Sequence, residues 1–520
     1  MGDTVENMKN EQKKVRIWFT VIAISLACAL SFSVWRAHDS VYLRPVYVRK
    51  MFAYMPYRIE YLLSRTLPAH AAEIPARAFA QEVPVLLYHG IVEEPDGANV
   101  LQRDFADQLF ALKQAGYATV TLADFEAFLD GTKTLPDRSV VLTFDDGRKD
   151  SFYPVDPVLH ALNYTAVQFV ITNYSLGKDN EESPFYLSVA ELKALQKTGR
   201  WEIASHSKAA HDFYAINEHG EEGHFLSNAL WIPSENRYET SSEYMLRIYE
   251  DLRGARDNLK TALGVETNSF AFPFGDFGRA GTNLSGSEQL LLHVVGKIYK
   301  RAYYQTWGSD GETHNRAGEG LLVRRINVSP LWSGDDLVRA LEAGRTKDLL
   351  YSGEQANDHD WQRLWGDISV AAENLHLQAP SDGDSAAAFL NGSTMWSNYE
   401  IDAHATVLAG TSFSVIARFK NGRNYVVCNF TEDATTVDEH IQGVIRSIAA
   451  HIPGNLSKGE HEFSMQVYNN RIACILDGEK IMSVMLVSPD LLSGGIGFKT
   501  GSRVNGESHA VVRSVYVRGI

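Results

Sequence analysis

Two short motifs carry side chains that could bind a metal ion and activate water. Asp145 and Asp146 follow an apolar run over 139–142, and His206 and His211 come from a later segment. One carboxylate and two imidazoles can hold a divalent ion and leave positions open for water and substrate. The other carboxylate is then free to accept a proton from that water. Together, the motifs favour a metal-dependent hydrolase.

Each motif alone has a plainer interpretation. Asp145, Asp146 and Gly147 form a common turn sequence. Two histidines on a loop are more often surface residues than ligands. The hypothesis therefore depends on whether the fold brings the two motifs together.

The composition indicates a folded protein with more than one domain. The chain has 520 residues, of which 45% are hydrophobic and 22% charged, and this length favours two or three domains. Its net charge of −15 argues against nucleic acid as the main partner. Two of the three cysteines, Cys428 and Cys474, lie in strand-like runs, and the sequence leaves open whether they are bridged or free.

The N-terminal region contains an uncharged apolar segment over residues 17–35. Its length suits a helix that crosses a bilayer, and basic residues precede it. Since no small-residue cleavage site follows, we expect an uncleaved signal anchor at 17–36, with a cleaved signal peptide as the alternative. Residues 1–16 would be a cytoplasmic tail, residues 37–80 a stalk, and the rest would lie outside the cytoplasm, in the periplasm or at the cell surface.

Strands and helices alternate from residue 83 onward. The pattern predicts strands over 83–88, 140–144, 166–171, 201–205 and 269–273, and helices over 101–116, 155–162, 189–198 and 243–263. We expect Ser241 or Ser242 to cap the last of these helices and Gly264 to end it. Such alternation indicates a parallel sheet or a (β/α) barrel, in which chemistry sits at the carboxyl ends of the strands. Both motifs fall at such ends.

The helical pattern stops after about Gly344. Residues 346–357 read as a linker, and short strands with Gly and Asn turns follow over 358–520. Asn469–Asn470 and Asp477–Gly478 are hairpin turn signals. This pattern predicts an all-β sandwich.

The motifs of residues 81–345 resemble those of the polysaccharide deacetylase family, also known as carbohydrate esterase family 4 or the NodB homology domain. The resemblance rests on 143–147, on 206–211, on 272–275 as a third motif and on 86–90 as a first strand. It implies a distorted (β/α)7 barrel. The second motif has one residue more than the usual H-[ST]-x-x-H spacing, and so resembles the branch that deacetylates poly-β-1,6-N-acetylglucosamine.

The resemblance also implies roles for individual residues. Asp145 would be the general base, and Asp146, His206 and His211 would bind one divalent metal ion. Zinc suits these ligands, as would cobalt, nickel or iron. The backbone near Phe274 and Gly275 would stabilise the oxyanion. Weaker candidates for lining the substrate pocket are Asp276 and Trp307.

The chain departs from the family pattern in two places. No arginine precedes the third motif within 268–272, where relatives place one that orients the base. The late Leu-x-His motif, often the source of the general acid, is replaced by the segment 324–328. His89, at the end of the first strand, is a candidate for the general acid. Its alternative role is to pack or to hydrogen-bond below the site.

The last domain resembles the concanavalin-like sandwich modules that are attached to glycan-active enzymes. Glycan binding through Trp396 or Tyr399 is one hypothesis, and a core position for Trp396 is the favoured alternative.

These features predict a membrane-anchored, metal-dependent N-deacetylase of an extracytoplasmic N-acetylhexosamine polysaccharide. The favoured substrate is an exopolysaccharide like poly-β-1,6-N-acetylglucosamine. The alternatives are a peptidoglycan or chitin-type deacetylase, and a catalytically degenerate protein that only binds glycan.

Overall fold

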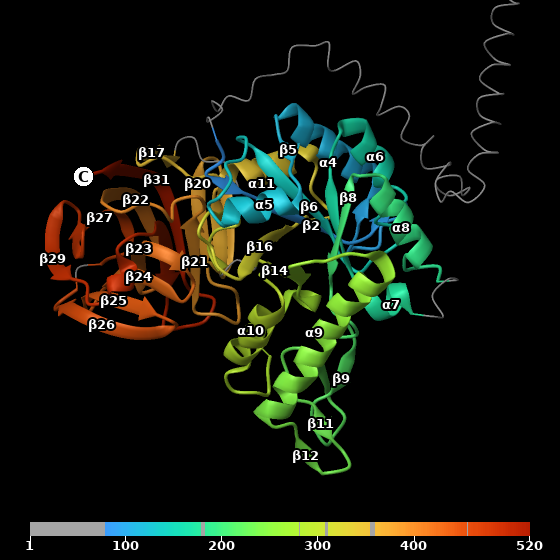
Figure 1. Cartoon of the computed structure of the whole chain (residues 1–520). Coiled ribbons are helices and arrows are strands. Elements are labelled where there is room, and N and C mark those ends of the chain that lie inside the picture. Colours follow the sequence, from blue (N-terminus) through green and yellow to red (C-terminus); the bar gives the residue numbers. More distant parts are fainter. Residues whose placement is uncertain (1–78, 178–182, 280, 307–309, 354–358, 455) are drawn as a thin grey trace, which may run out of the picture.

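The computed structural model describes residues 79–177, 183–279, 281–306, 310–353, 359–454 and 456–520. Within them an α/β barrel precedes an all-β part, and Figure 1 shows the two side by side. None of the helices in these ranges has the length and hydropathy needed to cross a membrane. The expected tail at 1–16, the anchor at 17–36 and nearly all of the stalk lie outside the described residues.

Seven parallel strands form a closed barrel. They are β2 (Val85–Tyr88), β6 (Ser139–Phe144), β7 (Ala166–Val170), β8 (Trp201–Ser205), β13 (Ser269–Ala271), β14 (Arg301–Gln305) and β16 (Leu322–Asn327). Their order is β2-β16-β14-β13-β8-β7-β6, and β2 also pairs with β6, which closes the ring. A short strand, β5 (Ala118–Thr119), pairs with β6 outside the ring. All residues of β2, β6 and β7 are buried, which explains their continuous apolar runs. The predicted (β/α)7 barrel is confirmed.

Helices cover the outside of the barrel. They are α4 (Gln102–Gln114), α5 (Leu122–Leu129), α6 (Asp156–Leu162), α7 (Thr172–Leu176), α8 (Val189–Lys197), α9 (Ser241–Leu263), α10 (Ser287–Ile298) and α11 (Gly334–Gly344). The cap of α9 is Thr240, not Ser241 or Ser242, because its side chain accepts from the N–H of Glu243 while the Glu243 side chain accepts from the N–H of Thr240. Gly264 ends this helix in the left-handed conformation, as predicted.

Further short strands lie outside the ring of seven parallel strands. They are β1 (Glu82–Val83), β3 (Ile91–Val92), β4 (Val100–Leu101), β9 (Phe213–Ala215), β10 (Glu222–His224), β11 (Trp231–Ile232), β12 (Arg237–Tyr238) and β15 (Asn315–Arg316). Strands β9 to β12 form two hairpins between β8 and α9, and Figure 1 shows them projecting below the barrel.

The C-terminal part consists of two antiparallel sheets. One contains β19 (Asp367–Ala371), β20 (Asn374–Gln378), β31 (His509–Gly519), β22 (Tyr399–Ala409), β27 (Gly459–Tyr468), β28 (Arg471–Leu476) and β29 (Glu479–Met485), with β17 (Tyr351–Ser352) paired to β31. The other contains β18 (Trp361–Trp365), β21 (Ser385–Leu390), β30 (Gly495–Gly501), β23 (Ser412–Asn421), β24 (Asn424–Thr431), β25 (Thr435–Ile441) and β26 (Val444–His451). The predicted all-β sandwich is confirmed. Two residues of the segment expected to be a linker, 346–357, form β17.

Trp396 and Tyr399 lie in the core of the sandwich. Their exposed fractions are 3% and 0%, and the indole N–H of Trp396 donates to the carbonyl of Lys347 at 2.7 Å. Neither ring can stack on a glycan from this position. The core position expected as the alternative is therefore the correct one for Trp396.

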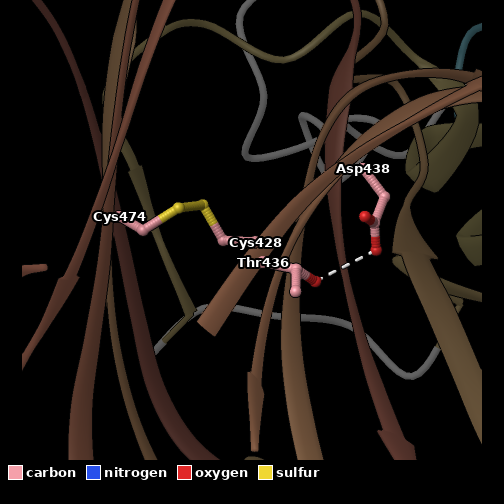
Figure 2. Close-up of a disulfide and its surroundings, with 4 residues drawn as sticks. All are labelled: Cys428, Thr436, Asp438 and Cys474. Carbon is pink, nitrogen blue, oxygen red and sulfur yellow. Dashed lines mark hydrogen bonds between the residues drawn. A yellow bond between two sulfur atoms is a disulfide. The ribbon is translucent and has the colours of Figure 1, made fainter. Parts of the chain in front are cut away.

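A disulfide joins the two sheets. Cys428 lies on β24 in one sheet and Cys474 lies on β28 in the other, with their Cα atoms 6.0 Å apart (Figure 2). The structure thus resolves the alternative that the sequence left open in favour of the bridge.

We expect reduction of this bridge to destabilise the sandwich. The bridge closes a loop with a sequence separation of 46 residues, which in the chain-entropy treatment corresponds to about 4 kcal/mol of the free energy of unfolding. Urea denaturation with and without reductant measures the difference. The double variant Cys428→Ala, Cys474→Ala should match the reduced protein and be insensitive to reductant. An equal midpoint for oxidised and reduced protein would contradict this expectation.

A buried histidine, His314, should make the protein sensitive to acid. Its side chain is 1% exposed, and burial lowers its pKa to about 4. The unfolded chain then binds more protons than the folded chain between these pKa values. The free energy of unfolding should therefore fall by about 3 kcal/mol as pH falls from about 6.5 to 4. His314→Gln should flatten this dependence in urea melts at several pH values. His219→Gln, at an exposed position, is the control that should leave it unchanged.

Candidate metal centre and active site

The fold brings the two sequence motifs together at one end of the barrel. Asp145 and Asp146 follow β6, and His206 follows β8, both at carboxyl ends of parallel strands. Asp146 and Ser207 adopt left-handed backbone conformations, with φ of 74° and 72°. Such conformations are uncommon outside glycine and concentrate at functional sites.

Three side chains form a cluster with the composition of a metal site. The Nε2 atoms of His206 and His211 lie 3.5 and 3.2 Å from Oδ1 of Asp146, and the three ligand atoms all lie within 4.8 Å of one another. Oδ1 of Asp146 is buried and has no hydrogen-bond partner among the described residues. Nδ1 of His206 lies 2.9 Å from the carbonyl of Ala271 on β13, which directs Nε2 to the cluster. These residues fit a divalent metal ion.

The pKa of Asp146 also suits a ligand. Burial would raise this pKa, but the close contacts with the rings of His206 and His211 and the nearby charges of His206 and His89 hold it well below its ordinary value. The carboxylate is therefore ionised, as metal binding requires.

Asp145 is held by an arginine that the sequence did not reveal. Arg325 on β16 donates from Nη1 and Nη2 to the two carboxylate oxygens of Asp145, at 2.6 and 2.8 Å. Both side chains are buried. Burial alone would raise the pKa of Asp145, but Arg325, together with His206, lowers it below its ordinary value. Asp145 is thus an ionised carboxylate fixed by a bidentate pair.

Asp145 is therefore fixed by an arginine from another part of the chain, although none precedes the third motif within 268–272. This arginine comes from β16. In the closed barrel β16 pairs with β2, and β2 pairs with β6, the strand that precedes Asp145. A partial signal was present in the sequence, since Arg324 and Arg325 are adjacent residues of β16, in which Arg325 is buried and Arg324 is partly exposed. Successive residues of a strand face opposite sides, and a fully buried arginine needs a carboxylate partner.

His89 follows β2 at the same end of the barrel. Its pKa is lowered from the ordinary value because burial disfavours the cation, while the charges of Asp145 and Asp146 act in the opposite direction. Arg325 and His206 also contribute to the lowering. His89 is thus close enough to Asp145 and to the metal cluster for their charges to affect its pKa.

The third motif supplies an aromatic wall beside the cluster. Phe274 lies in the 3-10 turn η3 (Pro273–Gly275), with a φ of 59°. Its ring centroid lies 4.6 Å from that of His211, and it stacks at 4.3 Å and 7° on His224, a residue that the sequence did not single out. The N–H of Gly275 donates to the carbonyl of Phe272 at 3.0 Å. An oxyanion donor from this turn would therefore be the N–H of Phe274, not that of Gly275.

Asp276 holds His224 in place. Its Oδ2 lies 2.7 Å from Nδ1 of His224 and accepts from Oγ of Ser227 at 2.5 Å, while its Oδ1 accepts from the N–H of Gly278. Burial would raise the pKa of Asp276, but these partners lower it. Asp276 lines a large cavity together with Phe274 and Gly275. Trp307, the other such candidate, lies outside the described residues.

Comparisons with known proteins agree with this site. The family described as Polysaccharide deacetylase matches residues 132–287. The poly-β-1,6-N-acetyl-D-glucosamine N-deacetylase of Escherichia coli strain K12 is 27% identical over 179 residues, which cover 33% of this chain and 27% of that protein. The enzyme of the same name from Staphylococcus epidermidis is 29% identical over 151 residues, covering 29% of this chain and 50% of that protein.

Among solved structures, a de-N-acetylase from Aggregatibacter actinomycetemcomitans is similar at 21% identity and a TM-score of 0.43, covering 49% of this chain and 98% of that one. The aligned part of this chain spans no more than half the length of the two curated relatives. The matching segment contains Asp145, Asp146, both cluster histidines and the third motif. The chain therefore carries a polysaccharide deacetylase domain.

Proposed function

We propose that this protein removes acetyl groups from an N-acetylhexosamine polysaccharide in a reaction that depends on a divalent metal ion. The observation that carries the proposal is the cluster of Asp146, His206 and His211 next to an ionised Asp145 that Arg325 fixes in place. The names of the curated relatives support poly-β-1,6-N-acetylglucosamine as the substrate.

An amide carbonyl is a poor electrophile, and a bound divalent ion would supply Lewis acidity and lower the pKa of the attacking water. The Asp145 carboxylate accepts the proton of that water, and Arg325 prevents the carboxylate from rotating away. The N–H of Phe274 is the proposed donor to the oxyanion.

His89 is the proposed general acid, which donates a proton to the nitrogen of the leaving amine. Its lowered pKa makes the protonated ring a stronger acid, although a smaller fraction of molecules carries that proton at neutral pH. Zn²⁺ is the proposed ion because it takes one carboxylate and two imidazoles with an open position; Co²⁺, Ni²⁺ and Fe²⁺ accept the same donors.

We further propose that the enzyme acts outside the cytoplasm, anchored through residues 17–36. The uncharged apolar segment supports the anchor. The Cys428–Cys474 bridge supports an oxidising compartment, where disulfides persist. The concanavalin-like resemblance of the sandwich supports a role in glycan binding.

The test incubates the full-length protein with β-1,6- and β-1,4-linked N-acetylglucosamine oligomers and with peptidoglycan, and measures free amine. We expect amine from the β-1,6 series, loss of activity on treatment with a chelator, and recovery on addition of Zn²⁺. Amine from β-1,4 substrates alone would instead favour a chitin or peptidoglycan deacetylase. No amine from any substrate would leave only a glycan-binding role.

A further inference from the structure

A cavity of about 1930 Å³ lies between the barrel and the sandwich. Its walls include Phe213, His224 and Phe274 near the metal cluster, and Arg423 and Gln442 from the sandwich. Pockets that hold one small ligand measure roughly 300–1000 Å³, so this cavity has room for several sugar rings. At its near end, the ring centroid of Phe274 lies 4.6 Å from that of His211.

The near end offers an exposed aromatic face. Phe213 on β9 is 52% exposed, and its ring centroid lies 5.2 Å from Phe274 and 5.3 Å from His224. Exposed aromatic rings next to a polar site give flat apolar surfaces of the kind that sugar rings cover.

The middle of the cavity is polar, but its charges are paired. Arg279 pairs with Asp310, and its guanidinium lies 4.3 Å from the ring centroid of Phe277. Arg324 donates to Glu319 at 2.8 Å, while Nε of Arg324 and Oε2 of Glu319 are buried and have no hydrogen-bond partner in the part of the chain that the structure describes. Paired charges give many donors and acceptors with little net charge, which suits a neutral chain rich in hydroxyl and acetamido groups.

The far end belongs to the sandwich. The turn between β23 and β24 places Arg423 against Glu288 of α10, with a nitrogen–oxygen distance of 3.5 Å and the arginine side chain 56% exposed. Asn424 accepts from the N–H of Gln442, which fixes the β25–β26 turn beside it. The sandwich therefore contributes amide and guanidinium groups to a cavity that begins next to the candidate active site.

The backbones of the barrel and the sandwich approach each other closely near this cavity. Gly311 has a φ of 84°, and a Cβ on it would lie 2.3 Å from the carbonyl oxygen of Lys420, at the end of β23. The end of β23, just before the turn that carries Arg423, therefore packs directly against the barrel.

We propose that this cavity binds the polysaccharide chain several sugar units away from the reacting one, with the sandwich forming the far binding subsite. This inference rests on the proposed deacetylase function and adds a reason for the second domain. Long chains would occupy the near and far ends together, whereas a disaccharide would reach only the near end. The sandwich then increases affinity for polymer without taking part in chemistry.

The test compares Arg423→Ala with the wild-type protein on poly-β-1,6-N-acetylglucosamine and on its disaccharide. Removal of the contacts that Arg423 makes should raise KM for the polymer roughly two- to tenfold and leave kcat for both substrates unchanged. Phe213→Ala, at the near end, should raise KM for both substrates. The matched control is Arg503→Ala, an exposed arginine of the same domain outside the cavity lining, which should change neither.

Unchanged disaccharide turnover shows that the barrel of Arg423→Ala is folded, and an unchanged urea midpoint shows that its sandwich is folded. An unchanged polymer KM in that variant would then overturn the inference while leaving the deacetylase function intact. A wild-type protein that releases no amine from either substrate would instead contradict the proposed function. In that case, polymer binding measured by calorimetry still tests the cavity, because Arg423→Ala should weaken it and Arg503→Ala should not.

Discussion

Asp145→Asn is expected to lower kcat by roughly 10²–10⁴-fold, the usual contribution of a positioned general base. The amide cannot accept a proton from the attacking water, and its NH₂ group would face a donor of Arg325. Metal content should stay unchanged, because Asp146 and the two histidines are intact. Amine release and metal analysis on the same preparation measure the two quantities separately.

Asp150→Asn is the matched control for this variant. Asp150 lies in the same loop after β6, pairs with Arg148 at 2.6 Å and does not belong to the cluster. Its replacement should leave kcat within a factor of a few of wild type. Full activity of Asp145→Asn with metal bound would show that another group accepts the proton.

The metal cluster could be predicted from sequence because it depends on local order along the chain. Asp146 and His206 each come soon after an apolar run that reads as a buried strand, and parallel strands present their carboxyl ends on one side. Placing Asp146 and His206 therefore required only the sequence of strands and helices, and no knowledge of which strands pair.

Arg325 could not be placed in that way. Its contact with Asp145 depends on closure of the barrel, in which β16 pairs with β2 and β2 pairs with β6. A pattern of apolar residues can indicate a buried strand but not its neighbours, and no strand was predicted over 322–327. The same limit applies to Cys428 and Cys474, whose bridge depends on how two sheets face each other.

The cavity at the domain boundary was also beyond the reach of the sequence. Phe213 and Arg423 read as ordinary residues of a loop and a hairpin turn. Their common cavity lies where the barrel and the sandwich meet, and the close approach of Gly311 to Lys420 at this boundary is a tertiary contact with no local signature. The N-cap of α9 was predicted wrongly for a smaller reason. Thr240 precedes two serines, which are equally good caps by residue type.

Removal of the Arg325 side chain should give the second large effect. In Arg325→Ala the Asp145 carboxylate loses both of its bidentate hydrogen bonds while remaining buried. A base that is no longer held in place can cost about 10²-fold in rate. The effect of burial is then opposed only by the smaller effects of His206 and His89, so the pKa of Asp145 rises.

The pH dependence distinguishes this positioning role from a merely structural one. The base must be ionised to work, so a higher pKa moves the acid limb of the kcat profile to higher pH, and part of the lost rate returns as pH is raised. Arg325→Lys keeps the charge but not the bidentate geometry, so it should restore the position of the limb while kcat stays low.

The control is Arg301→Ala, which removes another buried arginine that pairs with an aspartate, Asp130, at the opposite end of a barrel strand. Both alanine variants should lower the free energy of unfolding, but only Arg325→Ala should move the acid limb. If the two variants had identical pH profiles, Arg325 would serve folding alone, and the ionised state of Asp145 would need another cause.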